Sequence, residues 1–314
     1  MSDAADVIVI GAGLAGISCA RLLAQAGTSA VLLDKGRGLG GRMATRRVTL
    51  DAGEVTFDHG AQYLPATDGD FAQVLRAAGA RGWHSGTARV GAPRMSSLPR
   101  ALAAGLDITQ QVEITGLVQD AGLWHLTSPT AALRARRVVL TIPAPQARAL
   151  LGDAQPWAAG LSQVRMAPCL TLMAAFPPDS PRPFRHRRDP DHPLAWIAQD
   201  SSKPGRRAAA VTWVAQAGPD FSTLHLEQTP EDIAARMLPM LCDAIGVEPE
   251  TAVYARAHRW RHAQTAQPLG VPFLHNADRS LFLGGDWCLG ARAEHAWQSG
   301  SAIARDILGL AHAG

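Results

Sequence analysis

The sequence predicts an α/β fold: a parallel sheet built from βαβ units, interrupted by a second domain of mixed or antiparallel α+β type. Three observations predict it. Residues 7–34 have the pattern of strand, glycine turn, helix and strand. A further apolar run at 137–142 indicates a buried parallel strand. Between 161 and 261, short strand-like runs alternate with proline-rich and polar loops, which indicates an antiparallel insertion.

The first βαβ unit has the spacing of a dinucleotide-binding site. The apolar run Val7–Ile10 lacks alternation, as expected for a strand buried on both faces. The motif GAGLAG follows, and its glycines permit a tight turn, close approach of a pyrophosphate and close helix packing. The N-terminus of the next helix attracts phosphate. We expect the pyrophosphate to contact Gly11, Gly13, Leu14, Ala15 and Gly16.

The second strand ends at Asp34, about twenty residues after the glycines, where a carboxylate accepts hydrogen bonds from ribose hydroxyls. A carboxylate there argues against a 2′-phosphate on the bound dinucleotide. We assign the adjacent Lys35 to the same site. This fingerprint alone fits either NAD or FAD.

A second glycine motif, RGLGGR at residues 37–42, directly follows the ribose acid. Its glycines let backbone N–H groups approach phosphate oxygens, and its last arginine can make a charge-assisted contact. The run resembles the RxGGR motif of the amine-oxidase-like FAD superfamily, which favours FAD over NAD. We expect Gly41 and Arg42 to contact FAD.

The C-terminal region resembles a third flavin motif of the same superfamily. A last strand at 280–283 leads to Gly-Gly-Asp-Trp, and a helix is expected from Glu294 to Leu308. The resemblance implies that the aspartate bonds a ribityl or pyrophosphate oxygen and that the positive helix N-terminus faces flavin N1 and O2. The implied FAD contacts are Gly285, Asp286, Ala293, Glu294 and Ala296.

Two internal segments complete the expected cofactor site. In the superfamily, the position equivalent to Asp58–Tyr63 passes close to the flavin, which implies contacts from His59, Gly60, Ala61 and Gln62. A strand is expected over 107–117, and the resemblance implies that its Val112 makes a main-chain contact with the adenine.

The composition is that of a globular protein: 47% of the 314 residues are hydrophobic, and the net charge is only +3. No long basic run with interleaved aromatic residues is present, so nucleic acid is not an expected partner. No stretch approaches eighteen apolar residues and no targeting segment is evident, so we expect a cytoplasmic protein without a membrane span. The four cysteines are widely separated and are expected to be ordinary thiols.

These signals divide the chain into two expected domains. The FAD-binding domain would comprise residues 1–60, 106–160 and 275–314, and the substrate domain residues 61–105 and 161–274. Within the latter, a helix is expected over 230–246, because a proline at its first position is followed by two acids. The strongly basic loop 182–192 is expected to be solvated, with a lid over an anionic substrate as the alternative.

Several middle segments narrow the resemblance to bacterial renalase-like flavoproteins, over essentially the whole chain. They are residues 196–198, 201–206, 258–261, 268–270 and 285–288. The resemblance implies a Rossmann-like FAD-binding domain of the glutathione-reductase-2 type with an inserted substrate domain. It also implies an FAD-dependent oxidase that converts 2- or 6-dihydro isomers of NAD(P) to NAD(P)+ and reduces O2 to H2O2.

The sequence departs from true amine oxidases in two ways. Where those enzymes present a tyrosine beside the flavin, this chain has Arg292, and Tyr63 and Tyr254 are its only tyrosines. A cage of paired tyrosines around a neutral amine is therefore not expected. Lys203 is a candidate for the lysine that amine oxidases hold near flavin N5, but its Ser-Ser-Lys-Pro-Gly context predicts an exposed loop tip.

Hydride transfer from a dihydropyridine that becomes aromatic needs little acid-base help, so we expect no indispensable base. The side chains expected to line the flavin face are His59, Trp260, Trp287, Arg292 and His295. Two alternatives remain: an amine or polyene oxidase of the same superfamily, and a non-catalytic binding protein resembling the GDP dissociation inhibitors.

Overall fold

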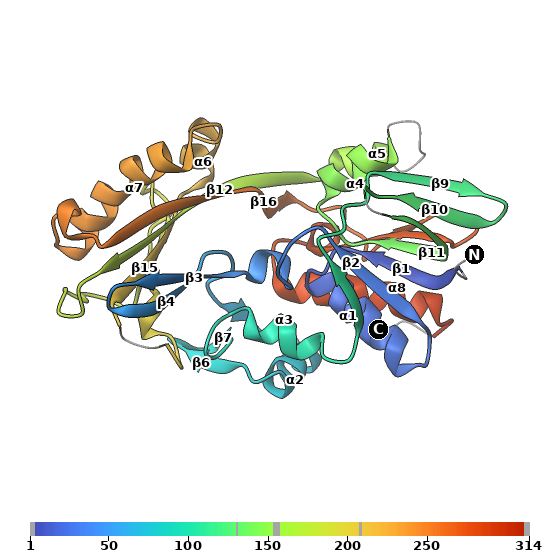
Figure 1. The fold of residues 1–314 in the computed structure, drawn as a ribbon, viewed down its shortest axis with the longest axis horizontal. Coiled ribbons are helices and arrows are strands. Elements are labelled where there is room, and N and C mark those ends of the chain that lie inside the picture. The colour runs from blue at the N-terminus through green and yellow to red at the C-terminus, as the bar shows by residue number, and fades with distance from the viewer. Residues whose placement is uncertain (1–3, 130, 153–157, 207–208, 311–314) are drawn as a thin grey trace.

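The structure, a computed structural model, describes residues 4–129, 131–152, 158–206 and 209–310. Figure 1 shows two lobes, one around a largely parallel sheet near the N-terminus and one around an antiparallel sheet. Two long antiparallel strands, β12 (Arg165–Phe176) and β16 (Tyr254–Gln267), run from the first lobe into the second. These two strands therefore connect the two lobes.

The first lobe contains the parallel sheet that the sequence predicts. Its strands follow the order β17-β18-β11-β1-β2-β8. Strand β1 pairs in parallel with both β2 and β11, and β11 pairs in parallel with β18, so the C-terminal strand returns to the sheet as predicted. The bounds are β1 Ala5–Ile10, β2 Ala30–Asp34, β8 Asp107–Gln110, β11 Ala132–Leu140, β17 Leu274–His275 and β18 Leu281–Leu283.

Helices α1 (Leu14–Gln25) and α8 (Ala293–Ile307) pack against each other on this sheet. A glycine is required at the contact, because a Cβ atom at Gly300 would lie 2.0 Å from the Ala15 carbonyl oxygen. The short helices α4 (Ala144–Leu151) and α5 (Ala158–Gln163) also pack together. In the described residues, none of the helices combines the length and apolarity needed to cross a membrane.

The strand expected over 107–117 is wrong in its extent. Strand β8 ends at Gln110, and Gln111 has a φ of +62°, a left-handed conformation that ends the extended run. Residues 116–120 form a separate strand, β9, which pairs antiparallel with β10 (Leu123–Thr127). Val112 therefore lies in a connection between two strands.

The second lobe is a five-stranded sheet in the order β13-β14-β15-β12-β16, antiparallel throughout as expected for the insertion. Helix α7 (Pro230–Ile245) packs on it; the helix begins at Thr229, whose hydroxyl accepts the Asp232 N–H group at 3.1 Å. The remaining bounds are β13 His186–Arg188, β14 Trp196–Gln199, β15 Val211–Gln216 and α6 Pro219–Leu224.

The segment after the second glycine motif forms a hairpin of β3 (Thr45–Leu50) and β4 (Gly53–Asp58). Phe57 on β4 packs with Met173 and Val214 of the antiparallel sheet, which holds the end of β4 against the second lobe. A small sheet and two helices follow: β5 Leu64–Pro65, α2 Gly69–Ala77, β6 Arg81–Trp83, β7 Ser85–Val90 and α3 Ser97–Leu102.

The cysteines are ordinary buried thiols, as predicted. Cys19, Cys169, Cys242 and Cys288 are all free and buried. Burial raises the pKa of Cys19 and of Cys288 to about 12, so neither is a thiolate at neutral pH.

Candidate active site

The first glycine motif forms an open cradle at the N-terminus of α1. Gly11 has a φ of +109°, and a Cβ at Gly16 would lie 2.0 Å from the Gly11 carbonyl oxygen, so both positions require glycine. A Cβ at Gly13 would meet nothing within 4 Å, so the backbone there faces open space. The first turn of α1, which begins with the buried Leu14 and Ala15, has no side-chain cap. This cradle suits a pyrophosphate.

Asp34 lies beside the cradle as predicted. Its Oδ2 accepts the Ala12 N–H group and its Oδ1 accepts the Gly36 N–H group, each at 2.6 Å. The Val112 N–H group donates to the Asp34 carbonyl at 3.0 Å, which brings the predicted adenine contact next to the predicted ribose contact. Lys35 is more than half exposed and pairs with Glu113 at 3.4 Å. The contacts of Asp34, Val112 and Lys35 with the nucleotide stay predictions.

An ion pair joins the second and third glycine motifs. The Arg42 guanidinium donates to both carboxylate oxygens of Asp286, at 2.9 and 2.5 Å, across 244 residues of sequence. The same carboxylate accepts the Thr265 hydroxyl at 3.1 Å, and Arg42 also donates to the Ala263 carbonyl at 3.1 Å. Both residues were predicted to contact FAD, and the fold brings them together at one place.

The start of α8 is held by one of the predicted cofactor residues. The Glu294 carboxylate accepts the Thr67 N–H and hydroxyl groups at 2.8 Å and the Asp68 N–H group at 3.1 Å. Burial opposes its ionisation, but the hydrogen bonds from Asp68 and Thr67 hold the Glu294 pKa below its usual value. Its side chain therefore fastens the loop before α2, while the neighbouring Ala293 is half-buried and Ala296 is buried.

The segment after β4 lies against Arg42. A Cβ at Gly60 would lie 2.0 Å from the Arg42 carbonyl oxygen, which also accepts the Ala61 N–H group at 2.8 Å. The side chains of Gln62 and Gln216 both donate to the Gly60 carbonyl, at 3.1 and 2.8 Å. Residues 60–61, predicted to pass the flavin, are thus fixed beside the second glycine motif.

His59 and Trp260, two predicted lining residues, are in direct contact. Their rings stack with centroids 5.3 Å apart, and the Trp260 Nε1–H group donates to the His59 carbonyl at 2.9 Å. His258 completes the group, with its ring edge-on to His59 at 4.8 Å. Sequence reasoning did not include His258 in the site, although its spacing from Trp260 on one strand places both side chains on the same face.

Both histidines are neutral at pH 7. Burial, followed by the neighbouring His258, lowers the pKa of His59 to about 4. Burial, followed by Arg46, lowers that of His258 to about 4. Among the described residues, the buried Nδ1 atom of His59 has no hydrogen-bond partner.

Lowering the pH from 6.5 to 4 is therefore expected to destabilise the protein through these two histidines. The unfolded chain, whose histidines titrate near 6.5, binds more protons in this interval than the folded chain. The contribution of these two histidines to the free energy of unfolding is thus fully present above pH 6.5 and is lost as the pH falls towards 4. Urea unfolding between pH 7.5 and 4.5 should show a shallower dependence in H258Q and an unchanged one in H125Q, which alters an exposed histidine. Equal slopes in H258Q and the wild type would contradict the assignment.

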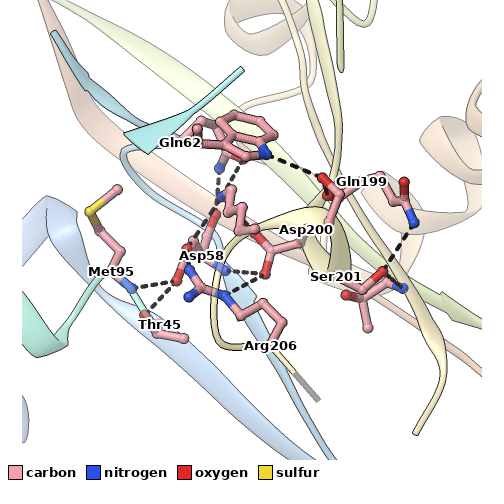
Figure 2. Close-up of polar contacts among 12 residues, drawn as sticks. Thr45, Asp58, Gln62, Met95, Gln199, Asp200, Ser201 and Arg206 are labelled. Carbon is pink, nitrogen blue, oxygen red and sulfur yellow. Dashed lines mark hydrogen bonds and ion pairs between the residues drawn. The ribbon is translucent and has the colours of Figure 1, made fainter. Parts of the chain in front are cut away.

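Lys203 contradicts the sequence prediction. Its side chain is fully buried rather than an exposed loop tip. Figure 2 shows the reason: Asp58 at the end of β4 and Asp200 on the turn after β14 converge with the basic side chains. The Lys203 ammonium donates to Asp200 at 2.6 Å and to Asp58 at 3.3 Å, and Arg206 pairs with Asp58. We call Asp58, Asp200, Lys203 and Arg206 the buried ion network.

The buried ion network contains two acids and two bases with almost no exposure. Burial opposes ionisation of Asp58, but Lys203 and Arg206 together hold its pKa below the usual value. Burial raises the pKa of Asp200. Gln62, a predicted cofactor residue, accepts a hydrogen bond from Lys203 at 3.3 Å, so its amide links the network to the Gly60 carbonyl.

The other three predicted lining residues are placed differently from one another. Trp287 is only 1% exposed, packs in the core beneath the parallel sheet and donates its indole N–H group to the Ile142 carbonyl at 3.1 Å. It is a core residue, and the prediction that it lines the flavin face is corrected. Arg292 is exposed immediately before α8, and His295 is half-buried in the first turn of that helix.

Comparisons with known proteins identify the family and the fold of this chain. Residues 9–78 match an NAD(P)-binding Rossmann-like domain, and residues 82–308 match the family of flavin-containing amine oxidoreductases. Putrescine oxidase bound to putrescine is 12% identical, with a TM-score of 0.73 over 98% of this chain and 99% of that one. Cyclohexylamine oxidase from Brevibacterium oxydans IH-35A is 14% identical, with a TM-score of 0.73 over 98% and 100%.

A third solved structure, from Exiguobacterium sp. 255-15 and described as a protoporphyrinogen oxidase, is 15% identical with a TM-score of 0.71 over 97% and 99% of the two chains. At these identities the solved structures establish the shared fold, and the family match covers most of the chain. That match decides against a non-catalytic binding protein. The chain belongs to the flavin-containing amine oxidoreductase family and is an FAD-dependent oxidoreductase.

Proposed function

We propose that this flavoenzyme is a renalase-like oxidase. Its substrates would be the 2- or 6-dihydro isomers of NAD(P), which it returns to NAD(P)+ while O2 is reduced to H2O2. The observation that carries the proposal is the place of the two tyrosines. Tyr254 stacks on Phe57 at 5.4 Å within the second lobe, whereas Tyr63 contacts Trp196 at 5.5 Å. The chain thus has no second tyrosine to pair with Tyr63 around an amine.

The residues fit a dinucleotide substrate better than a small amine. The resemblance aligns Arg292 with the cage tyrosine of amine oxidases. Arg292 is exposed and would meet a carboxamide or phosphate. The histidines beside Trp260 are neutral and carry no positive charge, and the proposed reaction requires no cation at that place. The substrate ring loses a hydride and becomes aromatic, so no proton must be removed from it. The protein's role is to orient the substrate ring and to exclude competing molecules from the site.

When bound, FAD supplies the hydride acceptor, and its two electrons pass to O2, which takes up one further proton to give H2O2. The residues that would hold it are the glycine cradle, Asp34 for a ribose and Arg42 with Asp286 for the phosphate or ribityl oxygens. The N-terminus of α8, which has no side-chain cap, would face flavin N1 and O2, where negative charge develops on reduction.

An anaerobic visible spectrum tests the proposal. The FAD-loaded protein is mixed in turn with borohydride-reduced NAD, which contains several dihydro isomers, with pure β-NADH and with simple amines. We expect rapid bleaching with the isomer mixture alone, and return of the colour in air with one H2O2 per flavin. The proposal would be contradicted if β-NADH bleached the flavin as fast as the isomer mixture does. It would also be contradicted if none of the three donors bleached the flavin.

An amine oxidase is the second candidate, because putrescine oxidase and cyclohexylamine oxidase share the fold. The same experiment separates the two. Bleaching by simple amines, with no response to the isomer mixture, would replace the first candidate by the second.

A further inference from the structure

A cluster of aromatic rings lies beyond the residues assigned so far. The His186 and Trp196 rings stack with centroids 5.2 Å apart and an angle of 21°. The His84 ring lies 4.1 Å from His186, and Tyr63 contacts both His84 at 5.0 Å and Trp196 at 5.5 Å. All four residues are half-buried rather than sealed in the core. We call Tyr63, His84, His186 and Trp196 the ring cluster.

The ring cluster contains polar atoms that the protein does not satisfy. The Trp196 Nε1 and His84 Nε2 atoms are buried and have no hydrogen-bond partner among the residues that the structure describes. Native proteins rarely leave such atoms without a partner, and a bound ligand is one of the few explanations. His84 also has a φ of +47°, an uncommon conformation for a residue with a side chain. Such conformations collect at ligand sites.

The basic loop supplies a cation beside these rings. Residues 186–188, expected to belong to a solvated loop, form the edge strand β13, and its pairing sets Arg188 directly opposite Trp196. Directly opposed residues project to the same face of a sheet, and so do residues two apart on one strand. Arg188, His186 and Trp196 therefore share a face, with Arg188 exposed at the edge.

Trp83 connects the ring cluster to the buried ion network. Trp83 contacts the His84 ring at 4.5 Å and donates its indole N–H group to Ser202 at 3.2 Å. The Lys203 ammonium lies 5.3 Å from the Trp83 ring centroid, a cation–π contact. Burial, His186 and Lys203 together lower the pKa of His84, so its ring is neutral at pH 7. One member of the ring cluster, His84, is thus linked through Trp83 to Lys203 of the buried ion network.

We propose that the ring cluster binds one nucleotide half of the substrate. A planar nitrogen heterocycle would stack on the rings and hydrogen-bond to Trp196 Nε1 and His84 Nε2, and its phosphate would pair with Arg188. This inference rests on the proposed function, because it assigns the protein groups that recognise the dihydro-NAD(P) substrate. Both halves of that substrate, the pyridine and the adenine nucleotide, have this chemistry.

Binding experiments on the FAD-loaded protein test the inference without turnover. Nicotinamide mononucleotide and AMP are titrated separately by calorimetry, and the tighter ligand identifies the half that the ring cluster accepts. We expect W196A to weaken that ligand by at least tenfold and W196F to weaken it less, because phenylalanine keeps the stacking and loses the N–H group. R188Q should weaken the nucleotide by several-fold but leave the corresponding nucleoside unchanged.

The matched control is F221A, which removes a half-buried ring on α6 whose centroid lies 4.5 Å from that of His225. This variant should bind nucleotide like the wild type. Since W196A alters a packed residue, its flavin spectrum and circular dichroism are compared first, and R188Q keeps the test valid if W196A misfolds. Wild-type protein that binds neither nucleotide at millimolar concentration, or variants that bind as the wild type does, would overturn the inference.

The two proposals fail separately. If the isomer mixture bleaches the flavin while W196A and R188Q keep the wild-type KM, the function stands and the ring cluster is not its binding site. If a nucleotide binds and the variants lose it, but no isomer bleaches the flavin, the binding site stands and the reaction is a different one.

Discussion

Replacing Lys203 with methionine is expected to lower the free energy of unfolding by about 3–5 kcal/mol. The substitution leaves two fully buried carboxylates, Asp58 and Asp200, with the single cation Arg206. One negative charge is then uncompensated in the interior, where charge is poorly solvated. Urea unfolding of the FAD-saturated protein at pH 8 measures the loss.

The loss in K203M should be smaller at pH 5 than at pH 8. Burial already raises the pKa of Asp200, and removal of Lys203 raises it further. The folded variant then takes up a proton on Asp200 more readily than the unfolded chain does, so its stability rises as the pH falls. Adding D200N to K203M removes the excess charge and should recover most of the loss.

The chain offers a matched control, because Lys35 is its other lysine. Lys35 pairs with Glu113 at 3.4 Å, but both side chains are more than half exposed. K35M is therefore expected to change the free energy of unfolding by about 0.5 kcal/mol at most. A loss below about 1 kcal/mol in K203M would show that the buried ion network does not support the fold as argued.

Replacing Arg42 with methionine is expected to weaken FAD binding by roughly a hundredfold. The guanidinium that would contact FAD is lost, and Asp286, which is only 7% exposed, is left with an unpaired negative charge where the phosphate or ribityl oxygens would lie. Loss of one partner of a buried charge pair costs about 2–5 kcal/mol, and 2.7 kcal/mol corresponds to roughly a hundredfold in affinity. Titration of the FAD-free protein with FAD, followed by quenching of flavin fluorescence, measures the change.

The control for Arg42 is Arg261, which makes the same two-pronged contact with a carboxylate. Its guanidinium donates to both oxygens of Glu227 at 2.5 and 2.6 Å, but both side chains are well exposed. R261M should therefore bind FAD within twofold of the wild type. Adding D286N to R42M should restore part of the affinity, since it removes the repulsion. Wild-type affinity in R42M would contradict the role of Arg42.

Local signals in the sequence were enough to predict the first βαβ unit and helix α7. The first glycine motif at the start of α1 and Asp34 at the end of β2 lie within one βαβ unit, so their relation depends on short-range geometry alone. The same holds for α7, whose start is set by Thr229 and whose end is set by Gly246 with a φ of +73°. Backbone conformation and side-chain periodicity are properties of neighbouring residues, and the sequence displays them directly.

Only the tertiary structure decided which polar groups are buried. Residues around Lys203 do form a turn, with Gly205 at a φ of +77°, yet packing of the β3–β4 hairpin against the antiparallel sheet encloses that turn. The ring cluster likewise joins His84 to His186, on segments about a hundred residues apart. Burial, charge pairing and ring contact depend on which distant segments meet, and no local pattern records that meeting.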